Sequence, residues 1–160
     1  ISINPFSKNE KKLLCDKINH IIIKNNKLDF LIDEKNPFFD TMPDNSISLV
    51  NKKSVTDFST KILSDIEFER FRANIYIDGL AAWEERNWIG KTIKINNIDF
   101  IVSGEISRCS ATNLKPSTDI VTINLPNQLK KTYDHINMGI YLVPLQNGVI
   151  SKNDKIIIYD

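Results

Sequence analysis

The apolar residues in the first half of the chain recur at helical spacing in two places. Ser7 and Glu10 have the spacing of a capping box, and the apolar positions after them predict a helix over residues 8–22: Leu13, Leu14, Ile18, Ile21 and Ile22. A second apolar face predicts a helix over residues 52–63, with the short strand SISLVN before it. The stretch KNPFFDTMPDN contains two prolines and predicts an irregular connector between the first helix and this strand.

From position 70 onward apolar and polar residues alternate, which is the period of a β-strand. In RFRANIYIDG the face predicted to be buried consists of Phe71, Ala73, Ile75 and Ile77. The opposite face consists of Arg70, Arg72, Asn74, Tyr76 and Asp78. Asn and Asp are disfavoured in strands, and repeated arginine indicates an anion site or an ion-pair network. A half-solvated sheet explains the same alternation, so both interpretations stay open.

The remaining pattern is mostly that of strands. Two alternating runs flank Asn96 and Asn97, a pair that tolerates positive φ, so a hairpin is expected there. NLPNQLKKTY predicts a short helix, and the last 24 residues predict two or three strands. The order of helix, strand, helix and then mostly strands favours an α+β fold, mainly β. We expect a largely antiparallel, closed or nearly closed, barrel-like sheet with the helices outside it.

Composition narrows the class of protein. A chain of 160 residues with 41% apolar and 26% charged residues suits one globular domain. The 21 basic and 20 acidic residues give a net charge of +1, so nothing supports a nucleic-acid partner. No apolar run approaches the roughly 20 residues of a membrane helix, and no signal peptide is visible. Two distant cysteines do not form a disulfide framework, which favours a reducing, cytoplasmic location.

Short catalytic motifs are missing from the sequence. It contains no GxGxxG, Walker loop, HExxH, CxxC or GxSxG. In WEERNW, the adjacent Glu84 and Glu85 predict a solvated turn, and the flanking Trp83 and Trp88 predict a cap on the core. His135 precedes a predicted strand, where it either packs structurally or orients a ligand.

The stretch ISRCSATNLKP places a thiol where a predicted strand ends and a polar loop begins. The guanidinium of Arg108 beside Cys109 favours the thiolate, the form that binds soft metals and carries sulfur. Cys15, by contrast, lies near the apolar edge of the first predicted helix. It is expected to pack as a small hydrophobic residue.

Four blocks of the sequence, in order, resemble the MOSC domain, named for the C-terminal domain of molybdenum cofactor sulfurase. The blocks are SISLVN, RFRANIYIDGLAAWEERNWIGKTIKI, SRCSATNLKP and GIYLVPLQNGVISKNDKI. They are most similar to bacterial MOSC proteins related to the mitochondrial amidoxime-reducing component. The resemblance implies a MOSC domain over residues 46–160, twisted and barrel-like with peripheral helices. Residues 1–45 are then a helix and connector, the remnant of an upstream region.

The same resemblance implies a site. The family's hallmark cysteine falls on Cys109, which in the reductase branch ligates the molybdenum of a molybdopterin cofactor and in the sulfurase branch carries sulfur. The block RFRANI matches a cofactor-contacting segment, and guanidinium groups suit phosphate oxygens. The implied cofactor-binding residues are Arg72, Asn74, Arg108, Thr112 and, by the looser match of SLVN, Asn51.

Three functions follow as expectations. The first is a molybdenum-dependent oxidoreductase that reduces N-hydroxylated small molecules with electrons from a partner redox protein. The second is a sulfur carrier in which Cys109 holds a persulfide received from a sulfur-donor protein. The third is a non-catalytic binding or assembly domain. No pyridoxal phosphate site is expected in this chain, and neither a nucleic acid nor a membrane is expected as a partner.

Overall fold

The computed structural model describes residues 4, 6–21, 29–30 and 46–159. It divides into two compact units, Ile1–Pro43 and Asp44–Asp160. The first unit contains α1 (Lys8–Ile21), and the second contains all the strands and the remaining helices. The predicted irregular connector at residues 35–45 lies outside the described residues.

The helix predicted near the N-terminus is confirmed as α1. The Ser7 Oγ accepts a hydrogen bond from the Glu10 N–H at 3.4 Å, as in a capping box. The Glu10 carboxylate accepts instead from the Asn4 N–H at 2.7 Å, so the reciprocal bond goes to an earlier residue. No residue of this helix is buried. Cys15 is half-buried, so the expectation that it packs as a small hydrophobic residue is met only in part.

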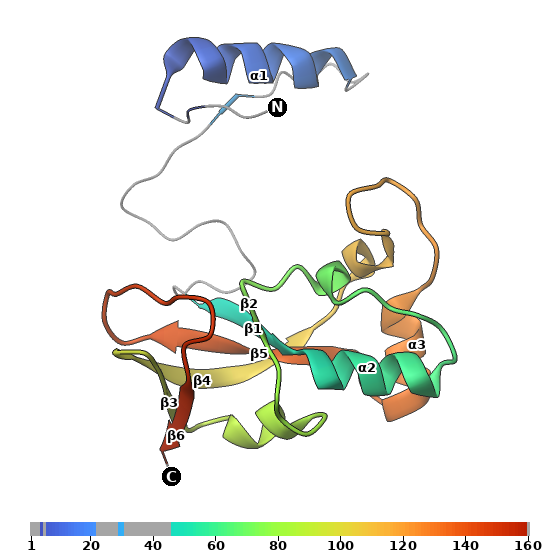
Figure 1. Cartoon of the computed structure of the whole chain (residues 1–160). Coiled ribbons are helices and arrows are strands. Elements are labelled where there is room, and N and C mark those ends of the chain that lie inside the picture. Colours follow the sequence, from blue (N-terminus) through green and yellow to red (C-terminus); the bar gives the residue numbers. More distant parts are fainter. Residues whose placement is uncertain (1–3, 5, 22–28, 31–45, 160) are drawn as a thin grey trace. The chain divides into compact units, whose positions relative to one another are not determined.

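The second unit is built on a six-stranded sheet of order β2-β1-β5-β4-β3-β6. Its strands are β1 (Ile47–Asn51), β2 (Ile75–Ile77), β3 (Thr92–Ile95), β4 (Ile98–Ser107), β5 (Asn137–Pro144) and β6 (Ile156–Tyr159). The pair β1–β2 is parallel and the other pairs are antiparallel. The sheet curls into a half-barrel whose edge strands are β2 and β6 (Figure 1). The predicted α+β, mainly antiparallel, barrel-like fold is confirmed.

Local features of β3, β4 and β5 shape this sheet. The predicted hairpin connects β3 to β4, and Asn96 in its turn has a φ of 55°. The β4–β5 ladder shifts register between Val102 and Gly104 and again between Glu105 and Ser107. Such irregularities bend a strand and increase its twist. They lie in the part of β4 that leads to Cys109.

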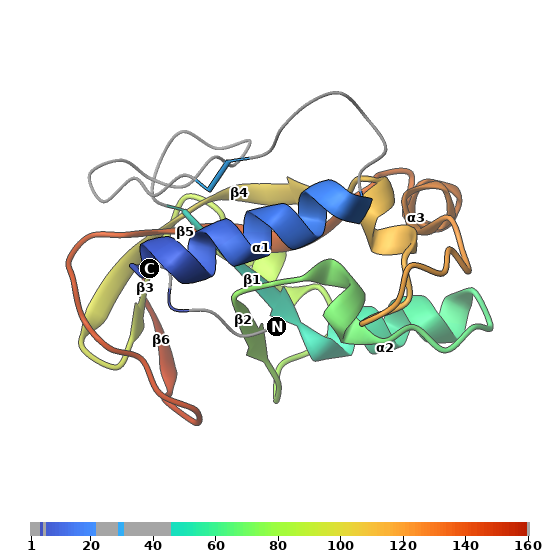
Figure 2. The ribbon, with the colours of Figure 1, turned by 90° about the horizontal axis from the view of Figure 1, so that it is seen from above.

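Two apolar clusters stabilise the second unit. The first fills the inside of the half-barrel and includes Leu49, Ile77, Trp88, Ile93, Phe100, Val102, Ile140 and Leu142. The second lies between the sheet and the helices α2 (Lys52–Lys61) and α3 (Leu125–Tyr133), and includes Val50, Val55, Phe58, Phe71, Leu125, Leu129 and Met138. Figures 1 and 2 show both helices at the same end of the sheet. The second cluster therefore packs α2 and α3 against strands β1 and β5.

The strand predicted from position 70 is wrong in its first half. Residues Phe68–Phe71 form a 3₁₀ helix (η1), Arg72 has a left-handed φ of 48°, and only Ile75–Ile77 pair as a strand. Phe71 and Ile77 are buried as predicted, whereas Ala73 and Ile75 are only partly buried. Phe68 and Phe71, three residues apart, share one face of a 3₁₀ turn and reach the second apolar cluster. The packing of Phe68 and Phe71 therefore favours a 3₁₀ helix here, although the alternation of apolar and polar residues predicted a strand.

We expect Gly139→Ala to lower the free energy of unfolding by about 1–3 kcal/mol. Gly139 in β5 has a φ of 83°, and an added Cβ would lie 2.4 Å from the Leu49 carbonyl oxygen. Gly104→Ala is the matched control, because a Cβ there meets nothing within 4 Å and no positive φ is involved. Urea denaturation of both variants tests this. Equal effects of the two substitutions would contradict it.

Candidate functional site

Cys109 lies at the point where β4 ends. It precedes the 3₁₀ turn η3 (Ser110–Asn113) and has extended backbone angles. Its carbonyl oxygen accepts two hydrogen bonds from Thr112, one from the N–H at 3.2 Å and one from the Oγ at 2.9 Å. Neither this thiol nor Cys15 is in a disulfide, and Cys109 is exposed. The turn therefore fixes the backbone of Cys109 and leaves its thiol accessible.

Arg108 anchors this strand end to two other segments. Its guanidinium donates from Nε to the Met138 carbonyl at 2.8 Å and from one terminal nitrogen to the Phe71 carbonyl at 2.9 Å. A second terminal nitrogen also donates to the Met138 carbonyl. The Arg108 backbone N–H donates to the Ile136 carbonyl at 2.9 Å. These bonds hold Cys109 between the start of β5 and the end of η1.

The charge of Arg108 is poorly compensated inside the protein. The residue is 8% exposed, and burial lowers the pKa of its guanidinium to about 10. Within residues 46–159 no carboxylate forms an ion pair with it. The groups that favour its charged form are Tyr141, Tyr76 and Cys109. Because a buried cation without a counter-ion is costly, a Cys109 thiolate or a bound anion would stabilise this arrangement.

An open sheet surface adjoins Arg108, and we call it the tyrosine face. Its members are Ser48, Tyr76, Gly104 and Tyr141 on the strands, together with Asn74 just before β2. Tyr141 pairs with Ser48 on one side and with Gly104 on the other. A Cβ at Gly104 would meet nothing within 4 Å, so this surface has room above it. Of these residues, Tyr141 and Tyr76 interact electrostatically with the buried Arg108 guanidinium.

The structure separates the two residues predicted from the RFRANI block. Arg72 is exposed and follows Phe71, whose carbonyl binds Arg108, so its backbone lies beside the Cys109 segment. Asn74 holds β2 to β1, because its Oδ1 accepts from the Ser48 N–H at 2.9 Å and from the Ser48 Oγ at 2.8 Å. Neither residue lies in β2, which begins at Ile75, so the two do not share one strand face. Arg72 keeps its guanidinium available, whereas the Asn74 oxygen is engaged.

Two further candidates have structural hydrogen bonds. Asn51 is fully buried, and its Oδ1 caps α2 by accepting from the Lys53 N–H at 3.0 Å. Its Nδ2 donates to the Ala81 carbonyl at 2.8 Å and to the Glu85 carboxylate at 3.0 Å. Thr112 is 4% exposed and uses its hydroxyl in the Cys109 turn. Asn51 therefore holds the start of α2, and Thr112 holds the backbone of Cys109.

The solvated turn predicted at Glu84 and Glu85 is wrong for Glu85. This residue lies in the 3₁₀ helix η2 (Glu84–Trp88) and is fully buried, as is most of Trp88. The Ser54 Oγ donates to its carboxylate at 2.7 Å, and burial raises its pKa. The spacing of Glu85 and Trp88 by three residues matches one face of a 3₁₀ turn. In the sequence, only that spacing indicated that Glu85 is buried together with Trp88.

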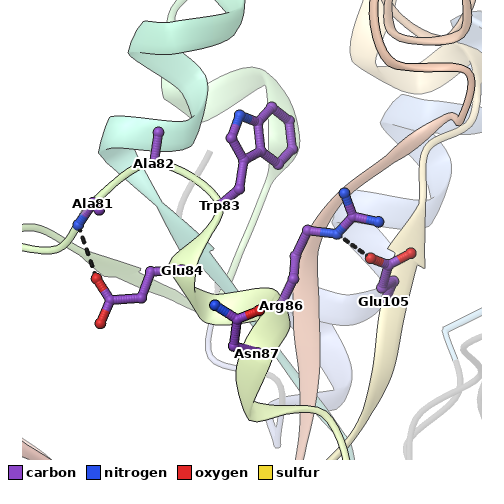
Figure 3. Close-up of a pocket in the computed structure, with 7 residues that line it drawn as sticks. All are labelled: Ala81, Ala82, Trp83, Glu84, Arg86, Asn87 and Glu105. Carbon is purple, nitrogen blue, oxygen red and sulfur yellow. Dashed lines mark hydrogen bonds and ion pairs between the residues drawn. The ribbon is translucent and has the colours of Figure 1, made fainter.

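A second polar cluster lies next to η2, at a pocket of about 600 Å³. Figure 3 shows its lining residues: Ala81, Ala82, Trp83, Glu84, Arg86, Asn87 and Glu105. Arg86 reaches from η2 to form an ion pair with Glu105 on β4. Trp83 has a left-handed φ of 67°, which is unusual for a bulky residue, and its indole N–H donates to Asp57 at 2.7 Å. The pocket is therefore lined by η2, by the residues just before it and by β4.

We expect Arg72→Gly to leave the free energy of unfolding unchanged or to raise it by up to about 1 kcal/mol, because glycine removes the cost of positive φ. Arg72→Ala is the matched control, since it removes the same guanidinium but retains that cost. Thermal melts of both variants give the comparison. A clear destabilisation by Arg72→Gly would show that the side chain is a structural contact rather than an available anion ligand.

None of the helices in the described part of the chain has the length and hydropathy of a membrane-spanning segment. In the same part of the chain, no three His, Cys, Asp or Glu side chains gather as a metal site.

Comparison with known proteins connects these features to a family. The chain is 30% identical over 87 residues to mitochondrial amidoxime reducing component 2 of Rattus norvegicus, which covers 54% of this chain and 25% of that protein. It is 25% identical over 113 residues to the Bos taurus protein of the same name, which covers 69% of this chain and 33% of that protein. The chain thus spans a third or less of these relatives.

A solved structure, YiiM from Geobacillus stearothermophilus, shares the fold with a TM-score of 0.54 at 19% identity. The similarity covers 71% of this chain and 54% of that one. The MOSC domain family model matches residues 37–157. That match includes β1 to β5 and the start of β6, with the Cys109 turn and the tyrosine face, and the chain belongs to the MOSC domain family.

Proposed function

We propose that this domain binds the molybdenum cofactor with Cys109 as a molybdenum ligand, and that it acts in the reduction of N-hydroxylated small molecules. The observation that supports this most is an exposed thiol that directly follows, in the chain, a buried guanidinium without a carboxylate partner among residues 46–159. Thiolate is the soft ligand that such a metal requires. The two curated relatives are named for the reduction of amidoximes.

The residues at the site suit an anionic pterin cofactor. Cys109 supplies the thiolate, and the buried Arg108 supplies a positive charge that an anion beside it would offset. The exposed guanidinium of Arg72 is available for phosphate oxygens, which it can bind in a bidentate manner. The tyrosine face offers the hydroxyl of Tyr141 and open space over Gly104. Asn51 and Thr112 support the site through hydrogen bonds to their neighbours.

When bound, the cofactor supplies two-electron chemistry at molybdenum. Removal of oxygen from an N-hydroxyl group takes two electrons and two protons and releases water. A partner redox protein supplies the electrons in this proposal, and a reducing, cytoplasmic compartment keeps Cys109 as a thiol. The chain's own part is to bind the cofactor, to orient it on the tyrosine face and to hold Cys109 at a fixed strand end.

Elemental analysis of the chain after native purification from cells that make the cofactor tests this proposal. Bound molybdenum that is lost in Cys109→Ala supports it. Sulfane sulfur on Cys109 without molybdenum would favour the sulfur-carrier function instead. Neither molybdenum nor sulfur would leave a non-catalytic binding or assembly domain.

A further inference from the structure

The loop after α3, taken as His135–Met138 and so including the first two residues of β5, contains a histidine and contacts the Cys109 strand end. Two of its carbonyls, those of Ile136 and Met138, accept hydrogen bonds from the backbone and guanidinium of Arg108 at 2.9 and 2.8 Å. Asn137 lies between them, and its N–H donates to His135 Nδ1 at 3.1 Å. The same three residues therefore link His135 to Arg108.

The Asn137 side chain ties this loop to β4 as well. Its Nδ2 donates to the Glu105 carboxylate, and its Oδ1 accepts from the Ser107 Oγ at 2.8 Å. Glu105 also pairs with Arg86, whose side chain is seen reaching toward it in Figure 3. The loop, β4 and η2 are thus joined in one polar cluster that ends beside Arg108.

The His135 ring is held firmly in this cluster. It stacks on Tyr133 with ring centroids 5.7 Å apart and an interplanar angle of 14°. Trp83 meets it edge-on at 5.9 Å. The Arg86 guanidinium lies 2.9 Å from Nε2. The ring can therefore change its hydrogen bonding only by changing its protonation or by leaving this position.

Both ring nitrogens of His135 face donors, the Asn137 N–H and the Arg86 guanidinium. A neutral imidazole has one lone pair on its ring nitrogens to accept a hydrogen bond, and an imidazolium has none. Protonation would also place a second cation against Arg86. The titratable and charged groups around the ring are Arg86, Glu105, Lys130, Tyr133 and Asp134, with Asp57 and Lys61 behind Tyr133.

We propose that His135 is a positioning residue for Arg108 and Cys109, which holds the loop in place while neutral and releases it when protonated. Release of the Asn137 N–H loosens the Ile136 and Met138 carbonyls, so the Arg108 guanidinium no longer supports the Cys109 thiolate. The inference rests on the proposed function only in taking Cys109 as the reacting group. It makes the site dependent on pH without any titration of a residue in the cofactor's immediate contact.

The direction of the pH dependence follows from the surroundings of the ring. Burial, followed by the charge of Arg86, lowers the pKa of His135 below 6.5. The unfolded chain therefore binds a proton at a higher pH than the folded chain. The stability contributed by the neutral ring is fully present above pH 6.5 and is lost as the pH falls through the lowered pKa.

The test measures alkylation of Cys109 by iodoacetamide between about pH 5 and pH 8, the range in which histidine titrates, in a Cys15→Ala background that leaves one thiol. His135→Asn is the key variant, because its amide oxygen can accept from the Asn137 N–H and does not titrate. Ionisation of the Cys109 thiol changes the alkylation rate of both proteins with pH. We therefore compare the ratio of the parent rate to the His135→Asn rate, in which this common effect drops out. We expect this ratio to be constant above pH 7 and to fall about two- to tenfold at the acidic end, as for loss of one hydrogen bond.

A control variant and a second measurement accompany this test. His20→Asn on α1 should leave the pH profile unchanged, because His20 is exposed and lies in the other unit. Amide hydrogen exchange at Arg108 should report the same loss of protection at low pH in the parent and not in His135→Asn. If His135→Asn does not fold, His135→Gln takes its place. Parallel pH profiles of the parent and the non-titrating variant would overturn the proposal, whether or not the chain binds molybdenum.

Discussion

Cys109→Ser should reduce bound molybdenum by at least about tenfold, since even outer-sphere changes at metal sites cost that much affinity. The same substitution should change the free energy of unfolding by no more than about 0.5 kcal/mol, as is usual for an exposed position. The physical reason is that the thiol is exposed, whereas the backbone of its turn is held by Thr112 and Arg108. A hydroxyl is a hard and poorly acidic ligand, so it does not replace the thiolate.

Melting temperature and metal content measured on the same preparation decide this prediction. Cys15→Ser is the matched control and should retain the metal, because Cys15 lies on α1 in the first unit. If Cys109→Ser lowers the melting temperature and leaves molybdenum in place, the thiol is a packing residue and the proposed role is wrong.

Arg108→Leu should lower the free energy of unfolding by about 2–4 kcal/mol, since it leaves two buried carbonyls without their donors. Those carbonyls belong to Met138 and Phe71 and come from β5 and η1. Some of the cost is offset because a buried and uncompensated charge disappears. Cofactor retention should fall as well, since the substitution removes the cation beside Cys109 and loosens the strand end.

Arg108→Lys separates the two effects. It preserves a positive charge but lacks the planar fork that reaches both carbonyls. We therefore expect it to recover part of the metal content and little of the stability, as measured by urea denaturation and elemental analysis. Equal stability of Arg108→Leu and the parent would show that these hydrogen bonds do not hold the site together.

The parts of the fold that depend on residues close together in the sequence could be predicted from the sequence. Helical spacing predicted α1 and α2, the Asn96–Asn97 pair predicted the β3–β4 hairpin, and alternation predicted β4 up to Cys109. Each of these signals repeats over several residues within one element. The antiparallel, curled sheet followed from the number and order of such elements.

The site needed contacts that no local pattern contains. The partners of Arg108 lie 30 and 37 residues away, and the hydrogen bonds that bury Glu85 come from Asn51 and Ser54, which lie 34 and 31 residues earlier. In the four residues of η1, Phe71 fits two patterns. It is an apolar position of the alternating strand pattern, and it also lies three residues after Phe68, as in a 3₁₀ turn. Tertiary packing chose between them, and the choice moved Arg72 out of the strand.

X-ray absorption at the molybdenum and selenium edges tests the central claim most directly. In a Cys15→Ser background, Cys109→Sec places one selenium at the proposed ligand position. If Cys109 ligates the metal, the molybdenum spectrum should contain a selenium neighbour at bonding distance, and the selenium spectrum should contain molybdenum. Bound molybdenum without that selenium neighbour would contradict the account.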